Sequence, residues 1–254
     1  MDSPVPNPAD LATSHTPERI RQRLKAPASH SYLRDFVYGA IDGTVTTFAV
    51  VSGVAGAGLS TEVIIVLGLA NLVGDGFSMA ASNFLGTKTE EELRRKARRT
   101  EENHVAHYPE GEREEVRQIF ASKGFEAELL EQVVEVITSD RDRWVDTMLV
   151  EELRVPLEGP SAIRAAMTTL IAFVLVGMIP LIVFIYNFFS AAVPINPYFA
   201  STVLTGVAFF FVGSAKALFV DESWYRAGLE TLAIGGAAAV LAYVVGSALN
   251  GIVS

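Results

Sequence analysis

The sequence contains no cysteine, and charged residues make up only 19% of its 254 positions. The lack of cysteine excludes disulfides, thiolate metal sites, iron–sulfur ligation and cysteine nucleophiles. The net charge of −9 argues against nucleic acid as a partner, because binding phosphates requires a basic surface. Residues 1–30 contain no apolar core of a signal peptide, so we expect no cleaved leader.

Hydrophobic residues, in contrast, account for 50% of the chain and gather in blocks of twenty or more. The hydrocarbon core of a bilayer is about 30 Å thick, and about 20 helical residues cross it. The candidate spans cover residues 36–59, 62–85, 163–189, 198–220 and 227–253. The sequence therefore predicts an all-α membrane protein with five transmembrane helices embedded in a lipid bilayer.

A long charged segment separates the second span from the third. We divide the chain into an N-terminal arm (1–34), spans one and two (35–86), a helical metal-binding insert (87–160) and spans three to five (161–254). Helical patterns in the insert cover residues 90–103, 109–123, 125–138 and 141–153, and Gly124 is placed to end the second of these. Between residues 86 and 160, 19 acidic residues outnumber 12 basic ones.

The basic residues indicate how the chain crosses the membrane. All 20 Lys and Arg residues lie in the arm, in the insert, at the start of the third span, or around the link between the fourth and fifth spans. The positive-inside rule then places the N-terminus and the insert in the cytoplasm and the C-terminus outside. We expect a bacterial plasma membrane, with a vacuolar membrane as the alternative.

Polar residues recur inside the first two spans. Ionisable groups there are costly and usually face the bundle interior or an aqueous path. Asp42 follows Asp35 by seven residues, on the same face of the first helix. The second span carries a stripe at four-residue spacing, made of Asn71, Asp75, Met79 and Asn83. Interhelical hydrogen bonding and packing are the alternative roles for its amides and thioether.

Among the polar residues of the first two spans, Asp42 is the one for which a functional role is best supported. No Lys or Arg lies within the first two spans to neutralise it, so a proton or a bound cation must do so. A buried carboxylate that exchanges a proton for a metal ion is what a cation/proton antiporter requires. Beside it, Gly39 and Gly43 predict close helix approach, within or between subunits, and a homodimer with a central pore would fit.

The insert carries pairs of potential metal ligands at helical spacing. These pairs are Glu101 with His104, Glu112 with Glu115, and Met148 with Glu152. Carboxylate, imidazole and thioether together suit Fe(II) or Mn(II) better than Mg(II) or Ca(II). Glutamates mixed with arginines also form ordinary surface salt bridges, so spacing leaves both interpretations open.

Several stretches of this sequence resemble the vacuolar iron transporter family. The resemblance lies in DFVYGAIDGTVTTFAVVSG at residues 35–53, DGFSMAASN at 75–83, EREEVRQIFASKGF at 112–125, RWVDTMLVEEL at 143–153 and GSAKALF at 213–219. It covers the chain from about Ser31 to the C-terminus, and the first of these motifs is specific.

The resemblance implies a five-helix homodimer that exports Fe(II) or Mn(II) from the cytoplasm in exchange for protons. It also implies that Asp42 and Met79 form the translocation site. The ligands that it implies for the cytoplasmic domain are Glu101, Glu112, Glu115, Met148 and Glu152. No tightly bound cofactor is expected, because the metal ions are the cargo and protons the counter-ions.

The chain departs from the family pattern at three places. His104 stands where a second glutamate is often found, and Leu149 replaces a second methionine and cannot coordinate a metal. Asn83 stands where a carboxylate is usual, while Asp75 adds a carboxylate two turns away on the same face. These changes bear on metal preference and on the number of ions held.

Two other classes of function are weighed against a transporter. A membrane-anchored metal sensor or scaffold would need only one helix without carboxylates, so the polar stripe argues against it. An intramembrane enzyme lacks support, because aspartyl-protease signatures and Ser–His or zinc-protease spacings are missing and all four histidines lie outside the spans. We therefore expect a transporter and not an enzyme.

Overall fold

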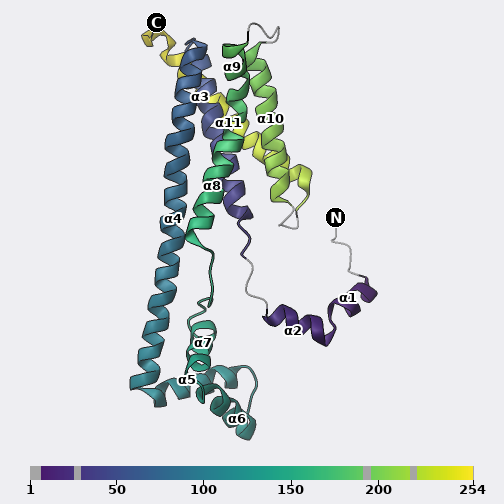
Figure 1. Cartoon of the computed structure of the whole chain (residues 1–254), viewed down its shortest axis with the longest axis vertical. Coiled ribbons are helices and arrows are strands. Elements are labelled where there is room, and N and C mark those ends of the chain that lie inside the picture. Colours follow the sequence, from purple (N-terminus) through teal and green to yellow (C-terminus); the bar gives the residue numbers. More distant parts are fainter. Residues whose placement is uncertain (1–6, 26–29, 191–195, 218–221, 254) are drawn as a thin grey trace. The chain divides into compact units, whose positions relative to one another are not determined.

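The computed structural model describes residues 7–25, 30–190, 196–217 and 222–253. Within these residues all regular elements are α-helices, as the sequence predicts (Figure 1). The chain forms two compact units, one made of residues 1–84 and 163–254 and the other of residues 85–162. The N-terminal arm contributes two short helices, α1 (Pro8–Ser14) and α2 (Pro17–Lys25).

The first unit is built around a bundle of apolar helices. They are α3 (Leu33–Gly56), the first part of α4 (Thr61–His107), α8 (Ala162–Gly177), α9 (Ile179–Phe189), α10 (Pro197–Lys216) and α11 (Trp224–Val253). Its core is rich in phenylalanine, with Phe173, Phe184 and Phe209 almost fully buried. Large apolar side chains also point outward, among them Val240, Leu241 and Val244 on α11, as expected for helices that face lipid.

Four helices, α3, α4, α10 and α11, are long and apolar enough to cross a membrane. The expected third span is instead a broken helix, because α8 and α9 meet at an angle of 50° near Met178. Pro180 has no N–H to donate to the preceding turn, which explains why the helix bends there. Counting this pair as one span gives five spans in a multi-pass membrane protein.

Parts of the expected elements lie outside the described residues. These parts are residues 1–6 and 26–29 of the N-terminal arm, residues 191–195 before the fourth expected span, residues 218–220 at the end of that span, with Leu218 and Phe219 of the motif at 213–219, and residue 254.

Glycines bring α3 close to two neighbouring helices. A Cβ atom on Gly39 or Gly43 would overlap the backbone of α8 at Thr169 or Phe173, respectively. At the other end of α3, Gly53 packs against Gly246 of α11 equally closely. The close approach predicted from the first-span glycines therefore occurs within one chain, and the homodimer stays a prediction.

The second unit consists of the last part of α4 and three short helices, α5 (Pro109–Ser122), α6 (Ala127–Thr138) and α7 (Arg141–Glu151) (Figure 1). Val116, Val134 and Val145 form its buried core. Gly124 ends the α5 region with a φ of +92°, a conformation that glycine adopts without strain. At the start of α7, the Asp140 side chain accepts a 2.8 Å hydrogen bond from the backbone N–H of Arg143.

Residues 90–103 are helical as expected, but they continue the second span without a break, because α4 runs through 47 residues. Just before this stretch, the hydroxyl of Thr89 donates a 2.8 Å hydrogen bond to the carbonyl of Leu85 within α4. Ion pairs at i,i+4, such as Lys88 with Glu92, support the charged part. The change in composition near residue 86 therefore marks a change in surroundings and not a helix end.

Candidate functional site

A cluster of three possible metal ligands lies where α4 ends and α5 begins. Glu101 and His104 on α4 and Glu112 on α5 each present a ligand atom, and these atoms lie within 4.8 Å of one another. His104 Nδ1 is 3.3 Å from an oxygen of Glu112 and 3.7 Å from an oxygen of Glu101. The turn at Tyr108 and Pro109 lets α5 fold back, so residues from two helices meet.

Both carboxylates of this cluster are buried. Only 3% of Glu101 and 5% of Glu112 is exposed, whereas His104 is open to solvent. The Oε2 atom of each glutamate is buried and has no hydrogen-bond partner among the described residues. Because an unsatisfied buried oxygen costs free energy, a cation bound here would offset a cost that the folded chain otherwise bears.

The electrostatics of the cluster also favour a cation. Burial raises the pKa of Glu112 to about 7, with further increases from Glu115 and Glu101, while His104 acts in the opposite direction. Burial, followed by the charge of Glu115, also raises the pKa of Glu152. These predicted ligands therefore form one group of mutually repelling carboxylates, and a divalent ion would relieve the repulsion.

Met148, the remaining predicted ligand in the insert, lies in a different environment. It is completely buried in the core of the second unit, beside Val116 and Val145. Leu149, which replaces a second methionine, is 3% exposed in the same core. The structure therefore gives both side chains a packing role, and coordination by Met148 stays a prediction.

In the first unit, the predicted pathway residues lie on α3 and α4. Asp42 is half-buried on α3, and its carboxyl group interacts electrostatically with that of Asp75 on α4. None of the ion pairs found among the described residues involves Asp42. Met79 is half-buried and packs against the apolar core of this unit.

The predicted polar residues of α3 and α4 are hydrogen-bonded to threonine hydroxyls that we did not predict from the sequence. Asn83 donates hydrogen bonds to Asp35 and to Thr169 of α8, each over 2.8 Å. Asn71 donates to the hydroxyls of Thr46 and Thr47 over 3.2 and 3.4 Å. Thr46 follows Asp42 by four residues, and that spacing was the available signal for its place on the same helix face.

The chain is similar to proteins of one family. The model of the VIT family matches residues 33–247. The chain is 32% identical to vacuolar iron transporter 1 of Arabidopsis thaliana over 214 residues, which cover 83% of each protein. It is 29% identical to vacuolar iron transporter 1 of Eucalyptus grandis, with 86% of each covered, and 30% identical to the vacuolar iron transporter of Toxoplasma gondii, with 87% of this chain and 76% of the relative covered. The chain belongs to the VIT family.

Proposed function

We propose that this protein transports Fe(II), Mn(II) or both out of the cytoplasm in exchange for protons. The observation that carries the proposal is Asp42, a half-buried carboxylate in an apolar bundle, which interacts with a second carboxylate at Asp75. Asp75 is exposed on α4, and two carboxylates that repel each other at the side of an apolar bundle favour a divalent cation or protons as neutralising partners. Relatives named vacuolar iron transporter support iron as a cargo.

The transport step follows from the charge of Asp42. When ionised, its carboxylate holds the metal ion together with the thioether of Met79. When a proton arrives from the far side of the membrane, the carboxyl becomes neutral and its attraction for the ion is lost. The ion leaves, and loss of the proton toward the cytoplasm restores the binding state.

The carboxylate cluster of the second unit is the proposed collector of cytoplasmic metal. Glu101, His104 and Glu112 form its centre, and Glu115 and Glu152 add negative charge that attracts cations. Imidazole with carboxylates suits Fe(II) and Mn(II). Replacement of a family glutamate by His104 lowers the negative charge of the site, which favours ions that accept nitrogen ligands.

The proposed setting is a homodimer without a tightly bound cofactor, with the N-terminus and the insert in the cytoplasm. This orientation rests on the one-sided distribution of Lys and Arg. The proposed location is a bacterial plasma membrane, and a vacuolar membrane, as in the names of the relatives, is the alternative.

Proteoliposomes test the transport step. We expect the parent protein to move Fe(II) and Mn(II) and to change the lumenal pH in parallel, and Asp42→Asn to abolish both signals. Glu222→Gln is the matched control, because Glu222 is an exposed carboxylate outside the helices of the bundle. Cobalt and zinc as competitors would define the preferred ion.

The same assay separates the alternatives. If Asp42→Asn transports as fast as the parent, the proposed step is wrong. If metal moves without any pH change, the coupling to protons is wrong. If the parent protein binds metal but moves none, the sensor or scaffold alternative is favoured.

A further inference from the structure

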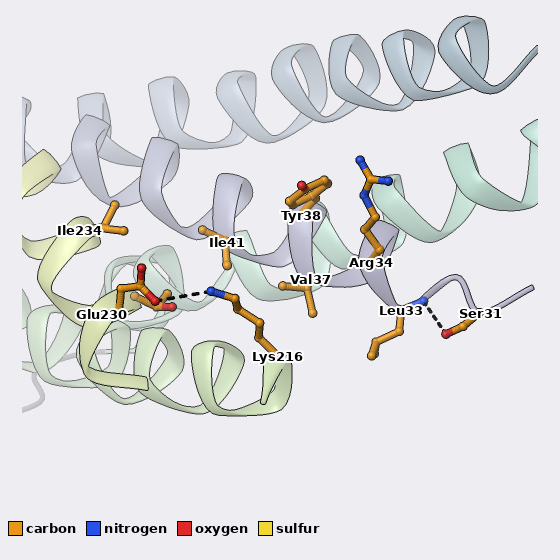
Figure 2. A pocket seen from close by; sticks show the side chains of 10 residues that line it. Ser31, Leu33, Arg34, Val37, Tyr38, Ile41, Lys216, Glu230 and Ile234 are labelled. Carbon is orange, nitrogen blue, oxygen red and sulfur yellow. Dashed lines mark hydrogen bonds and ion pairs between the residues drawn. The ribbon is translucent and has the colours of Figure 1, made fainter. Parts of the chain in front are cut away.

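A pocket of about 570 Å³ opens between α3, α10 and α11 of the first unit. It lies at the end of the bundle where α3 and α11 begin and α10 ends, as Figure 2 shows. Aliphatic side chains form most of its wall, with Val37 and Ile41 from α3 and Ile234 from α11. The polar stripe of the proposed transport pathway contributes none of the residues that line it.

Two basic side chains stand in this largely apolar wall. Lys216 at the end of α10 lies 3.4 Å from a carboxylate oxygen of Glu230, the contact drawn in Figure 2. Arg34 lies with its guanidinium 5.3 Å from the centre of the Tyr38 ring. Asp35, next to Arg34, does not line the pocket and is hydrogen-bonded to Asn83 on α4. Among the charged residues that line the pocket, Arg34 and Lys216 are basic and Glu230 is acidic, so the lining carries one net positive charge.

The level at which the pocket lies in the bilayer also indicates which kind of molecule binds there. Trp224 and Tyr225, in the first turn of α11, are 60% and 46% exposed. Exposed Trp and Tyr residues collect at the level of the lipid head groups. Basic pockets between membrane helices at this level bind negatively charged head groups. The pocket volume is also in the range of small-molecule sites.

We propose that the pocket binds one phospholipid with a negatively charged head group. Figure 2 shows the Lys216 ammonium turned toward Glu230 and the Arg34 guanidinium turned away from that pair, so the phosphate lies against Arg34, Lys216 adds positive charge at the pocket, and an acyl chain follows Val37, Ile41 and Ile234 into the bundle. This inference is independent of the proposed transport step, because it concerns the side of α3 that lies against α10 and α11. Its consequence is that lipid composition affects the packing of α3, the helix that carries Asp42.

Native mass spectrometry of the purified, delipidated full chain tests this site. After addition of phosphatidylglycerol or phosphatidylcholine, we expect the parent to retain phosphatidylglycerol preferentially. The variant Arg34→Gln/Lys216→Gln should lose this retention on the order of fivefold or more. Arg226→Gln is the matched control, because Arg226 is a basic residue in the first turn of α11 that does not line the pocket.

A second variant keeps the test independent of charge. Ile234→Trp should fill the apolar part and lower lipid retention, whereas Val240→Trp, at an exposed position farther along α11, should not. Phosphatidylglycerol should also raise the Tm of the parent, and inorganic phosphate alone should not. The proposal would be overturned if the parent retained the two lipids equally, or if phosphate raised the Tm as much as phosphatidylglycerol does. It would also be overturned if Arg34→Gln/Lys216→Gln retained as much lipid as Arg226→Gln, or Ile234→Trp as much as Val240→Trp.

Discussion

The side-chain amide of Asn83 donates a 2.8 Å hydrogen bond to a carboxylate oxygen of Asp35 and thereby joins α4 to α3. The same amide nitrogen reaches the hydroxyl of Thr169 over 2.8 Å, so it also joins α4 to α8. The resemblance to the vacuolar iron transporter family implies a carboxylate at this position, where the chain has Asn83. A carboxylate there would repel Asp35, whereas the amide supplies the donor that Asp35 accepts.

Replacing Asn83 with leucine should therefore destabilise the first unit. Leucine has a similar size but no donor, so Asp35 and Thr169 would each lose a partner, at a cost of about 1–2 kcal/mol in membrane helices. Thermal unfolding in detergent should show a lower Tm for Asn83→Leu. The exposed neighbour Ser82 is the control position, and a Tm for Asn83→Leu equal to that of Ser82→Ala would show that the link is unimportant.

The buried carboxylates of the second unit should dominate its affinity for metal. We expect Glu112→Gln to weaken binding of Mn(II) at least about tenfold, because it removes a negatively charged ligand from a buried site. Calorimetric titration of the purified chain would measure this change. Glu110→Gln, an exposed glutamate on the same helix, should leave the affinity unchanged, and an equal loss in both variants would argue against a specific site.

Metal binding should strengthen as the pH rises. The pKa of Glu112 is about 7 and its ordinary value is 4.5. Between these two pH values the folded metal-free chain therefore holds a proton on Glu112 that the unfolded chain has released. A metal ion must displace this proton, so affinity should increase from pH 5.5 to pH 7 and then level off. Titrations with Mn(II) across this range would measure the trend.

The stability of the metal-free protein should change in the opposite direction. A raised carboxyl pKa favours the folded state at low pH, and this contribution is lost as the pH rises from about 4.5 through 7. We therefore expect Tm without metal to fall between pH 5.5 and pH 8, and to fall less in Glu112→Gln than in Glu110→Gln. Identical pH profiles for the two variants would contradict the assigned pKa.

The contact between α3 and α8 should tolerate no added side chain. A Cβ on Gly43 would overlap the backbone of Phe173, which cannot move without shifting α8. Gly43→Ala should therefore lower the Tm and the yield of folded protein. At Gly236 nothing lies within 4 Å of an added Cβ, so Gly236→Ala should be neutral or stabilising by about 1 kcal/mol. Equal behaviour of the two variants would contradict this packing.

The helices of the second unit were predictable because residues that stop helices separate them. Pro109 begins α5, Gly124 follows it, and Asp140 caps α7, so the expected and observed limits differ by two residues at most. The course of α4 was not predictable in the same way. A change from apolar to charged residues affects the solvent that a helix needs, but it breaks no backbone hydrogen bond.

The candidate sites were predictable only within single helices. Helical spacing predicted that Glu101 would lie beside His104, but the approach of Glu112 depends on how α5 folds back. Similarly, hydropathy detected the third span but not its bend at Met178, because proline is tolerated in membrane helices. Thr169 was missed because threonine is common in such helices, and its role depends on contacts with residues far away in the sequence.

The glycine contacts of α3 limit which parts of the bundle are free to move. Main chain meets main chain at Gly39 and Gly43 on one side and at Gly53 on the other, without long side chains that could change rotamer to permit sliding. Helices α3, α8 and α11 should therefore shift as one rigid body during a transport cycle. If Asp42 is the proposed transport site, access to it from alternate sides of the bilayer would then require the other helices to move around this fixed frame.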